Sequence, residues 1–200
     1  MFARLPGVNK QTKSTATPGR LVSLELKHGD ALETFLSEFD AEPHELQGYF
    51  CSRGASIEQA VGLLDASSQG ERLIETMVRG ETVAQDWVQN STWFWELGTR
   101  LQGVINLRHR LTPALEQEGG HIGYSVARPF RRQGVASKML DAVLDHCREL
   151  GIQQTLLTCS SDNVASIGTI EKHGGVLHRE GWSEPSQEIL RWYWIDLKNA

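Results

Sequence analysis

Residues 131–140, RRQGVASKML, place two arginines and Gly134 directly before a segment with helical periodicity. The first amide groups of a helix lack carbonyl partners, and a glycine leaves them uncovered, so an anion can approach the backbone there. No acidic residue occurs between Glu118 and Asp141, whereas this window contains four basic residues: Arg128, Arg131, Arg132 and Lys138. Because arginine binds phosphate oxygens in a bidentate geometry, the segment predicts a phosphate site. The alternative is a solvated helix start with ordinary surface arginines.

Strands are expected on both sides of this helix. Residues 135–151 repeat their apolar side chains on one helical face and end in a glycine, which is a common helix stop. Residues 119–126 and 152–160 have the composition of strands. The order strand, helix, strand implies a parallel pair that is joined by a crossover helix.

The remaining elements are predicted from periodicity and from glycine, proline and capping residues. A short helix over residues 162–175 begins with Asp162 or Asn163 as its cap and ends in two glycines. Further strands are expected at 21–27, 91–98, 101–109 and 187–197, a helix at 29–42, and two or three short helices between 43 and 80.

The length and the composition indicate one domain. Two hundred residues, 40% of them apolar and 22% charged, suffice for one substantial core and are too few for two ordinary domains. Residues 1–20 are polar and contain two prolines, so we expect a flexible tail there and a single domain over residues 21–200. A transit peptide is the alternative for the tail.

Charge and cysteine content exclude several classes of protein. The net charge of −5 argues against a dedicated nucleic-acid binder. The spacings of Cys51, Cys147 and Cys159 match no metal-binding motif, so free thiols and no metal are expected. Because no apolar run approaches the roughly 18 residues of a membrane span, we expect a cytoplasmic protein without membrane contact. We expect it to be a monomer or a homodimer.

The segment Arg131-Arg132-Gln133-Gly134-Val135-Ala136 resembles the Q/R-x-x-G-x-G/A loop of the GNAT family of N-acetyltransferases, and N-x-x-S at residue 163 fits the same family. The resemblance covers roughly residues 90–197. The sequence segments INLRH, GGHIGY and TIEKHGG suggest an uncharacterised bacterial-type branch of the family. It implies a mixed α/β fold with a central, mostly antiparallel sheet of six or seven strands, one splayed parallel pair and flanking helices. It also implies acetyl-CoA as co-substrate and an amine as acceptor.

The resemblance assigns cofactor contacts to individual residues. Tyr124, Ser125 and Val126 would offer backbone groups to the pantetheine arm, as if the cofactor were an added strand. The main-chain amides of residues 131–137 would hold the pyrophosphate, a set that consists of Arg131, Arg132, Gln133, Gly134, Val135, Ala136 and Ser137. Asn163 would contact the pantetheine arm, and its alternative role is that of a helix cap.

Acyl transfer to an amine needs a neutral nucleophile and an acceptor for its proton. His121 stands where many relatives carry a base, so it is the first candidate, with a rate that rises with pH near 6.5. Its alternative role is a strand histidine whose ring is satisfied by a neighbouring carbonyl. Glu118 is the second candidate, Tyr124 would pack or orient the substrate, and Cys159 is expected to be a buried apolar side chain rather than an acyl carrier.

The family tyrosine that protonates the leaving thiolate of CoA stands seven residues after the asparagine, and here that position is Ile170. Ser166 and Thr169 are hydroxyls nearby, but a water or the positive end of the helix could also stabilise the thiolate. We therefore expect an N-acetyltransferase that acts by direct transfer on a primary amine of a small molecule or a protein. The alternatives are an acyl-CoA sensor without turnover and a transferase for a longer acyl group.

Overall fold

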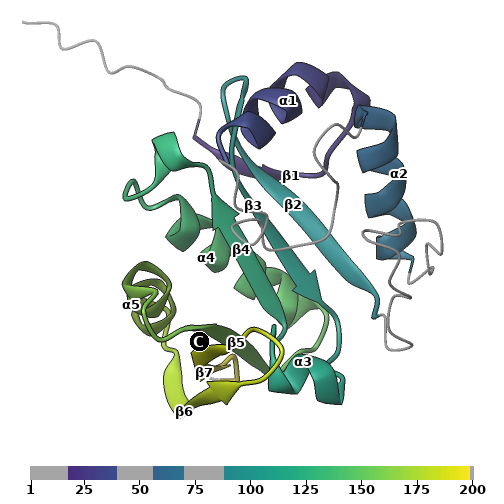
Figure 1. Ribbon diagram of the computed structural model, residues 1–200. Coiled ribbons are helices and arrows are strands. Elements are labelled where there is room, and N and C mark those ends of the chain that lie inside the picture. The colour runs from purple at the N-terminus through teal and green to yellow at the C-terminus, as the bar shows by residue number, and fades with distance from the viewer. Residues whose placement is uncertain (1–17, 40–55, 70–87, 199–200) are drawn as a thin grey trace, which may run out of the picture.

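The computed structural model describes residues 18–39, 56–69 and 88–198 (Figure 1). This part of the chain contains both strands and helices. Their order is β1 Arg20–Val22, the 3-10 helix η1 Leu26–His28, α1 Gly29–Ser37, α2 Ile57–Ser68, β2 Asn90–Leu97, β3 Arg100–Arg108, α3 Pro113–Gln117, β4 Ile122–Val126, the 3-10 turn η3 Arg128–Phe130, α4 Val135–Glu149, β5 Gln154–Ser160, α5 Val164–Lys172, β6 Val176–Ser183 and β7 Glu188–Asp196.

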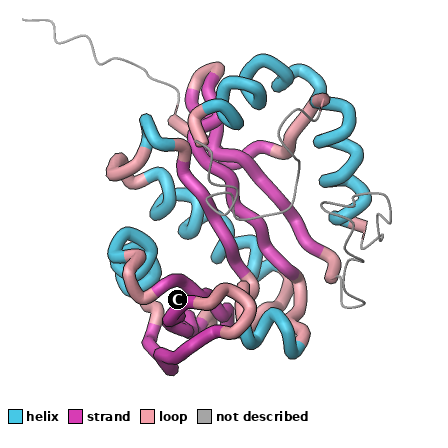
Figure 2. Tube along the Cα trace, viewed as in Figure 1, coloured by secondary structure: helices cyan, strands magenta, loops and turns pink. Residues whose placement is uncertain are grey.

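The strands divide into two sheets (Figure 2). The first has the order β1-β2-β3-β4 and the second the order β5-β7-β6, and all of their ladders are antiparallel. The predicted class, a mixed α/β fold with mostly antiparallel strands and flanking helices, is confirmed. The expected parallel pair, β4 and β5, is splayed so far that it forms no ladder, and the sheet is divided there.

Several predicted boundaries need correction. The strand expected over 21–27 ends at Val22, because a 3-10 turn follows it, and the helix expected over 29–42 ends at Ser37. Of the region 43–80, α2 is a helix as predicted, and the rest lies outside the described residues. The strand β6 and the short helix α3 were not predicted.

Helices cover both faces of the first sheet. On one face, α4 contributes Met139, Leu140 and Val143 to a core that it shares with β3 and with Leu157 of β5. On the other face, Phe35 of α1 packs against Phe94 of β2 with 5.5 Å between ring centroids. Since α4 contacts both sheets, it holds them in one body although they share no ladder.

The two sheets meet where a glycine pair precedes β4. Gly120 has a φ of +63°, and a Cβ at this position would lie 2.3 Å from the carbonyl oxygen of Leu156 in β5. Only glycine allows so close an approach in this conformation. The next residue, His121, donates its backbone N–H to that same oxygen at 2.7 Å. We refer to this contact between residues 119–121 and Leu156 as the sheet junction.

Candidate active site

The open edge of β4 is the first part of the site. Hydrogen-bonded pairs alternate along an antiparallel ladder. The bonds at the two ends of β4 fix this alternation: the Arg108 N–H donates to the His121 carbonyl at 2.8 Å, and the Ala127 N–H donates to the Gln102 carbonyl at 3.0 Å. The backbone groups of Ser125 therefore belong to the ladder with β3, whereas those of Tyr124 and Val126 face the gap between β4 and β5. Two of the three residues predicted to offer backbone groups thus present them there.

The loop after β4 connects this strand to the start of α4. Arg131 donates from Nε to the Val126 carbonyl at 3.0 Å, which ties the loop to the strand. Arg132 has a φ of 63° and Gly134 a φ of 77°. Left-handed residues bring successive backbone N–H groups to one side of a loop, where they can bind anions. Arg132 lacks the freedom of glycine, so this conformation costs about 1–2 kcal/mol, a cost typical of functional loops.

The N-terminus of α4 is not covered by a side chain. Gly134 is the N-cap and supplies no capping group, and a Cβ built on it would meet nothing within 4 Å. Ala136 and Ser137 are half-buried in the first turn, while the side chain of Val135 is buried in the core. The first amide N–H groups of α4 are therefore free to bind an anion, as expected for a helix that begins after a glycine.

A further cation, not predicted from the sequence, lies beside this turn. Lys172 at the end of α5 donates from Nζ to the Ser137 hydroxyl at 3.1 Å. The neighbouring His173 lies 2.9 Å from the Asp141 carboxylate and fixes the end of α5 against α4. Lys172 is visible in the sequence as the basic residue of the segment IEKHGG. Its contact with the start of α4 could not be predicted, because it lies 34 residues after Lys138 in the sequence.

Asn163 is the N-cap of α5. Its Oδ1 accepts a hydrogen bond from the Ser166 N–H at 3.0 Å, so the predicted capping role is confirmed. The cap uses the side-chain oxygen, which leaves two amide hydrogens as donors on an exposed side chain. The geometry is thus compatible with a second role in binding a cofactor amide.

His121 belongs to the sheet junction. Its Nδ1 accepts a hydrogen bond from the Leu156 N–H at 3.0 Å, so the ring proton of the neutral form is on Nε2. Burial, aided by Arg108, lowers the pKa of His121 from 6.5 to about 4. The lone pair that could take a substrate proton is engaged by Leu156. This favours the alternative role of His121, that of a strand histidine whose ring is satisfied by the neighbouring backbone. The partner is the N–H of Leu156, whereas the sequence suggested a carbonyl.

Glu118 lies on the loop before the sheet junction. Its Oε2 accepts a hydrogen bond from the hydroxyl of Ser183, a buried residue in β6, at 2.5 Å. The contact joins the end of α3 to the outer strand of the second sheet. Glu118 is half-buried and remains a candidate proton acceptor.

The Tyr124 side chain crosses from β4 toward α5. Its hydroxyl is buried and has no hydrogen-bond partner within the described residues. Burial raises the pKa of Tyr124 to about 12, although the nearby hydroxyls of Ser166 and Thr169 act to lower it. Neither of these hydroxyls forms a hydrogen bond of normal geometry with it. A buried polar group without a partner costs about 1–3 kcal/mol.

Cysteine and metal chemistry receive little support from the described residues. Burial raises the pKa of the Cys159 thiol to about 11, and a neutral thiol is a poor nucleophile. Cys147 is buried in the core. Among residues 18–39, 56–69 and 88–198, no three His, Cys, Asp or Glu side chains form a group that could hold a metal ion.

Aromatic side chains of β2 pack in the core. Phe94 and Trp95 lie in two different hydrophobic clusters, as expected for neighbours in a strand. Trp93 stacks on His146 of α4 with 4.7 Å between ring centroids.

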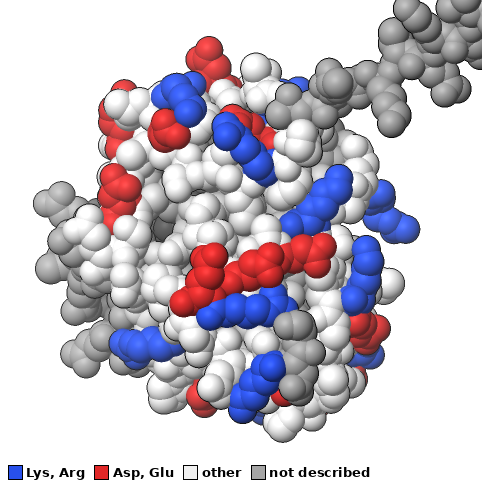
Figure 3. Space-filling model, turned by 180° about the vertical axis from the view of Figure 1, so that it is seen from behind, with Lys and Arg blue, Asp and Glu red and all other residues white. Residues whose placement is uncertain are grey.

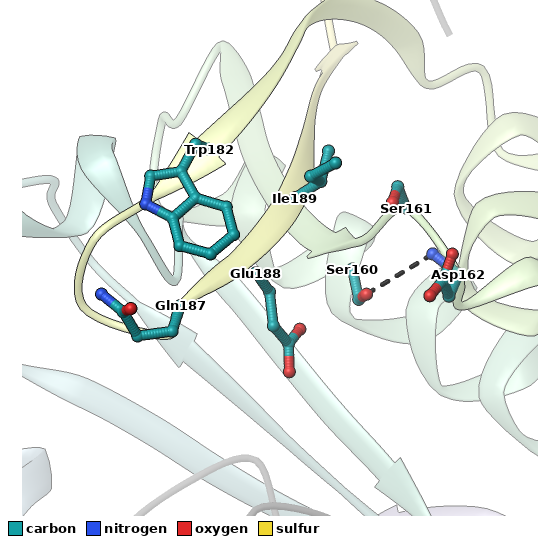
Figure 4. Close-up of a pocket in the computed structure, with 7 residues that line it drawn as sticks. All are labelled: Ser160, Ser161, Asp162, Trp182, Gln187, Glu188 and Ile189. Carbon is teal, nitrogen blue, oxygen red and sulfur yellow. Dashed lines mark hydrogen bonds between the residues drawn. The ribbon is translucent and has the colours of Figure 1, made fainter.

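A pocket of about 370 Å³ opens at the carboxyl end of β5, next to Asn163 (Figure 4). Trp182 and Gln187 of the β6–β7 hairpin stand on one side of it, and Ser160 and Asp162 on the other. Its lining residues are Ser160, Ser161, Asp162, Trp182, Gln187, Glu188 and Ile189. Two carboxylates and an exposed tryptophan suit a cationic ligand.

Acidic and basic side chains are mixed on the face that Figure 3 shows, where a row of carboxylates lies against basic groups. Ion pairs of this kind also occur within α4, such as Arg148 with Asp145 at 2.7 Å. The described part of this face carries no broad basic patch of the kind that binds nucleic acids. No helix in the described ranges is both long and apolar enough to span a membrane.

An open strand edge, a helix N-terminus without a side-chain cap and two splayed sheets lie together in this part of the fold. The sequence profile of the acetyltransferase (GNAT) family matches residues 35–175. The chain therefore belongs to the GNAT family of acyltransferase enzymes, as its sequence motif predicted. A search of curated proteins finds no match.

Solved structures of acetyltransferases share the fold. The enzyme of Salmonella typhimurium that modifies the N-terminal serine of ribosomal protein L7/L12 has a TM-score of 0.62 at 18% identity, over 90% of this chain and 96% of that chain. YncA of Salmonella typhimurium, a putative acetyltransferase solved with acetyl-CoA, has a TM-score of 0.58 at 13% identity, over 92% and 95%. An N-acetyltransferase of Staphylococcus aureus Mu50 has a TM-score of 0.59 at 15% identity, over 91% and 100%.

Replacement of Gly134 tests the anion site. Gly134→Val should weaken acetyl-CoA binding at least about tenfold, because a branched side chain would cover the first amides of α4. Calorimetric titration measures the affinity. Gly151→Val is the matched control, because Gly151 lies at the other end of the same helix with a φ of +73° and open space around its Cβ position. Both variants carry the same backbone strain, so equal affinities would contradict the assignment.

Replacement of His121 separates a structural role from a base. The lowered pKa means that His121 stabilises the fold above pH 6.5 and that this contribution, up to about 3 kcal/mol, is lost as the pH falls toward 4. His121→Asn keeps an acceptor for Leu156 and should remove this pH dependence, whereas His121→Leu should cost about 1–3 kcal/mol at pH 7.5. Denaturant unfolding between pH 4 and 7.5 measures both effects.

The turnover of the same variants gives the second readout. A junction role predicts that His121→Asn keeps kcat within about threefold of the parent. A base role predicts that both variants fall by about 10²-fold or more, because neither side chain can take a proton. In that case the rate of the parent should rise with pH near 4 rather than near 6.5.

Proposed function

We propose that the protein transfers an acetyl group from acetyl-CoA directly to a primary amine. The observation that carries this proposal is the continuous path from the gap-facing edge of β4 at Tyr124, past Val126, whose carbonyl is bonded by Arg131, to the uncapped N-terminus of α4 at Gly134. The path offers backbone groups first to amides and then to an anion, which is the order of chemical groups along the pantetheine arm and the pyrophosphate of CoA.

The proposed roles of the chain follow this path. The exposed backbone groups of β4 hold the pantetheine arm, and the amide donors of Asn163 contact it from α5. The first amides of α4, with Arg132 and Lys172 nearby, hold the pyrophosphate. The sheet junction closes the inner end of the gap, so the thioester lies between the diverging strands.

Direct transfer is preferred to an acyl-enzyme route. The raised pKa of Cys159 keeps its thiol neutral, so it would not compete with an amine for the thioester. The amine must lose its own proton before it attacks, and Glu118 or water accepts that proton. His121 is proposed as a positioning residue that fixes the gap rather than as the base.

The turnover assay decides between enzyme and sensor. We expect release of free CoA from acetyl-CoA in the presence of a panel of primary amines, with mass spectrometry of the acetylated product. Tight acetyl-CoA binding without turnover of any amine would instead support the sensor. A higher kcat/KM for propionyl-CoA or butyryl-CoA than for acetyl-CoA would support the transferase of longer acyl groups.

The acceptor is proposed to enter through the pocket beside Asn163. Glu188 and Asp162 would attract an acceptor that carries a second positive charge, such as a diamine or a basic peptide. Glu188→Gln should raise the KM of a diamine about three- to tenfold, with a smaller effect at high salt, and leave the Kd of acetyl-CoA unchanged. Glu33→Gln on α1 is the control for loss of one surface carboxylate. An unchanged KM would place the acceptor elsewhere.

A further inference from the structure

Lys172 places a positive charge beside the positive end of α4. Its Nζ donates a hydrogen bond to the hydroxyl of Ser137, in the first turn of that helix, at 3.1 Å. The N-terminus of a helix carries a partial positive charge, so a cation beside it is unfavourable unless an anion neutralises both. The first turn of α4 contains no acidic residue, and Gly134 supplies no side-chain cap. This pairing of like charges therefore suits a bound anion.

His173 holds the end of α5 against the same turn of α4. Its side chain is 5% exposed. Its Nδ1 lies 2.6 Å from the carbonyl oxygen of Thr169 in α5, and it is the donor there because a carbonyl oxygen only accepts. Its Nε2 lies 2.9 Å from the Asp141 carboxylate and 3.3 Å from the Ser137 hydroxyl. Ser137 and Asp141 are four residues apart and thus share one face of α4. The ring is therefore bound to both helices at the place that Lys172 reaches.

Asp141 has two opposite effects on an anion bound at this turn. Its carboxylate is 71% exposed and lies one helical turn after Ser137. By Coulomb's law alone it repels a phosphate at the start of α4, so its removal would strengthen binding. The same carboxylate contacts His173, so its removal also loosens the end of α5 that carries Lys172. The sign of the net effect shows which of the two is larger.

We propose that Asp141 and His173 are positioning residues for Lys172, and that Lys172 binds the pyrophosphate of CoA. This rests on the acetyl-CoA binding proposed above. Lysine has a long and flexible side chain, so holding it against a ligand costs conformational entropy. His173 is the next residue in the chain and fixes the backbone from which Lys172 extends, so less freedom remains to be lost on binding. Asp141 thus favours anion binding although it is itself an anion.

Asp141→Ala tests the proposal by the sign of its effect. The Kd of acetyl-CoA, measured by calorimetric titration, should rise about five- to tenfold, because one well-placed cationic contact is lost. Asp145→Ala is the matched control: Asp145 lies one turn further along α4, is 76% exposed and carries the same charge. Its replacement should change the Kd less than about twofold, because salt screens an exposed charge farther from the site. An unchanged or lower Kd for Asp141→Ala would overturn the positioning role.

A double-mutant cycle shows whether the effect passes through Lys172. Lys172→Met should weaken acetyl-CoA binding by about the same factor as Asp141→Ala, and the two losses should not add, because no cation is left to position. Additive losses would contradict this route.

His173 is tested by a conservative variant. His173→Gln keeps an N–H donor for Asp141 and should bind acetyl-CoA within about threefold of the parent, whereas His173→Leu should match Asp141→Ala. Equal affinities of the two variants of His173 would show that the contact with Asp141 is not what matters.

A change of co-substrate identifies the phosphate group. Acetyl-3′-dephospho-CoA keeps the pyrophosphate and lacks the phosphate on the ribose, so Asp141→Ala should weaken its binding by the same factor. A loss confined to acetyl-CoA would overturn the assignment to the pyrophosphate. In turnover with an amine, the KM of acetyl-CoA should rise in Asp141→Ala while kcat stays within about threefold, because Lys172 does not contact the reacting atoms.

The outcomes separate this proposal from the proposed function. A parent that binds no acetyl-CoA overturns both. A parent that binds it, with an Asp141→Ala variant that binds it equally well or better, overturns the positioning role alone. Thermal unfolding of each variant is measured in parallel. A lower melting temperature of Asp141→Ala with an unchanged Kd would show that the contact of His173 with Asp141 supports only the fold, and would also overturn the proposal.

Discussion

The contact of His121 with Leu156 determines how the rest of the site is built. A backbone N–H and a ring nitrogen of one residue bind the carbonyl and the N–H of another, and the adjacent Gly120 lets the two chains approach closely enough for both bonds. The side chain of His121 thereby takes the place of a backbone acceptor at the point where a ladder between β4 and β5 would otherwise continue. Beyond it, the strands diverge, and the backbone groups of Tyr124 face the gap between them.

This use of the imidazole conflicts with the role of a base. A neutral histidine has one acceptor nitrogen, and here that nitrogen holds the Leu156 N–H. Protonation of the ring would place two donors face to face inside the core, and the lowered pKa of His121 reflects the cost of a buried charge. In the proposed reaction, the proton acceptor is therefore a group that does not hold the sheets together. Glu118 fits that description, because its carboxylate contacts Ser183 rather than Leu156.

Local patterns in the sequence predicted what depends on local physics. The amphipathic spacing of α4 and the cap at Asn163 follow from interactions within a few residues, and both are present as expected. The strand β6 was missed because nearly all of it is exposed, so its sequence carries no alternation and its existence depends on pairing with β7. The sheet junction could not be predicted for a related reason. It joins His121 to a residue 35 positions away through a side chain that could have played several other roles.

Three features of this region are unfavourable for folding taken alone: the left-handed Arg132, the unpartnered Tyr124 hydroxyl and the N-terminus of α4 without a side-chain cap. Each costs free energy that a simple substitution would recover, by glycine, phenylalanine or serine respectively. All three border the path from β4 to α4, although the described residues contain the same kinds of feature elsewhere, such as the left-handed Gln187 and the unpartnered Thr155 hydroxyl. A bound anion would satisfy the helix terminus and give the strained loop a function. We interpret the strained loop and the helix terminus without a side-chain cap as parts of the proposed anion site in its free form.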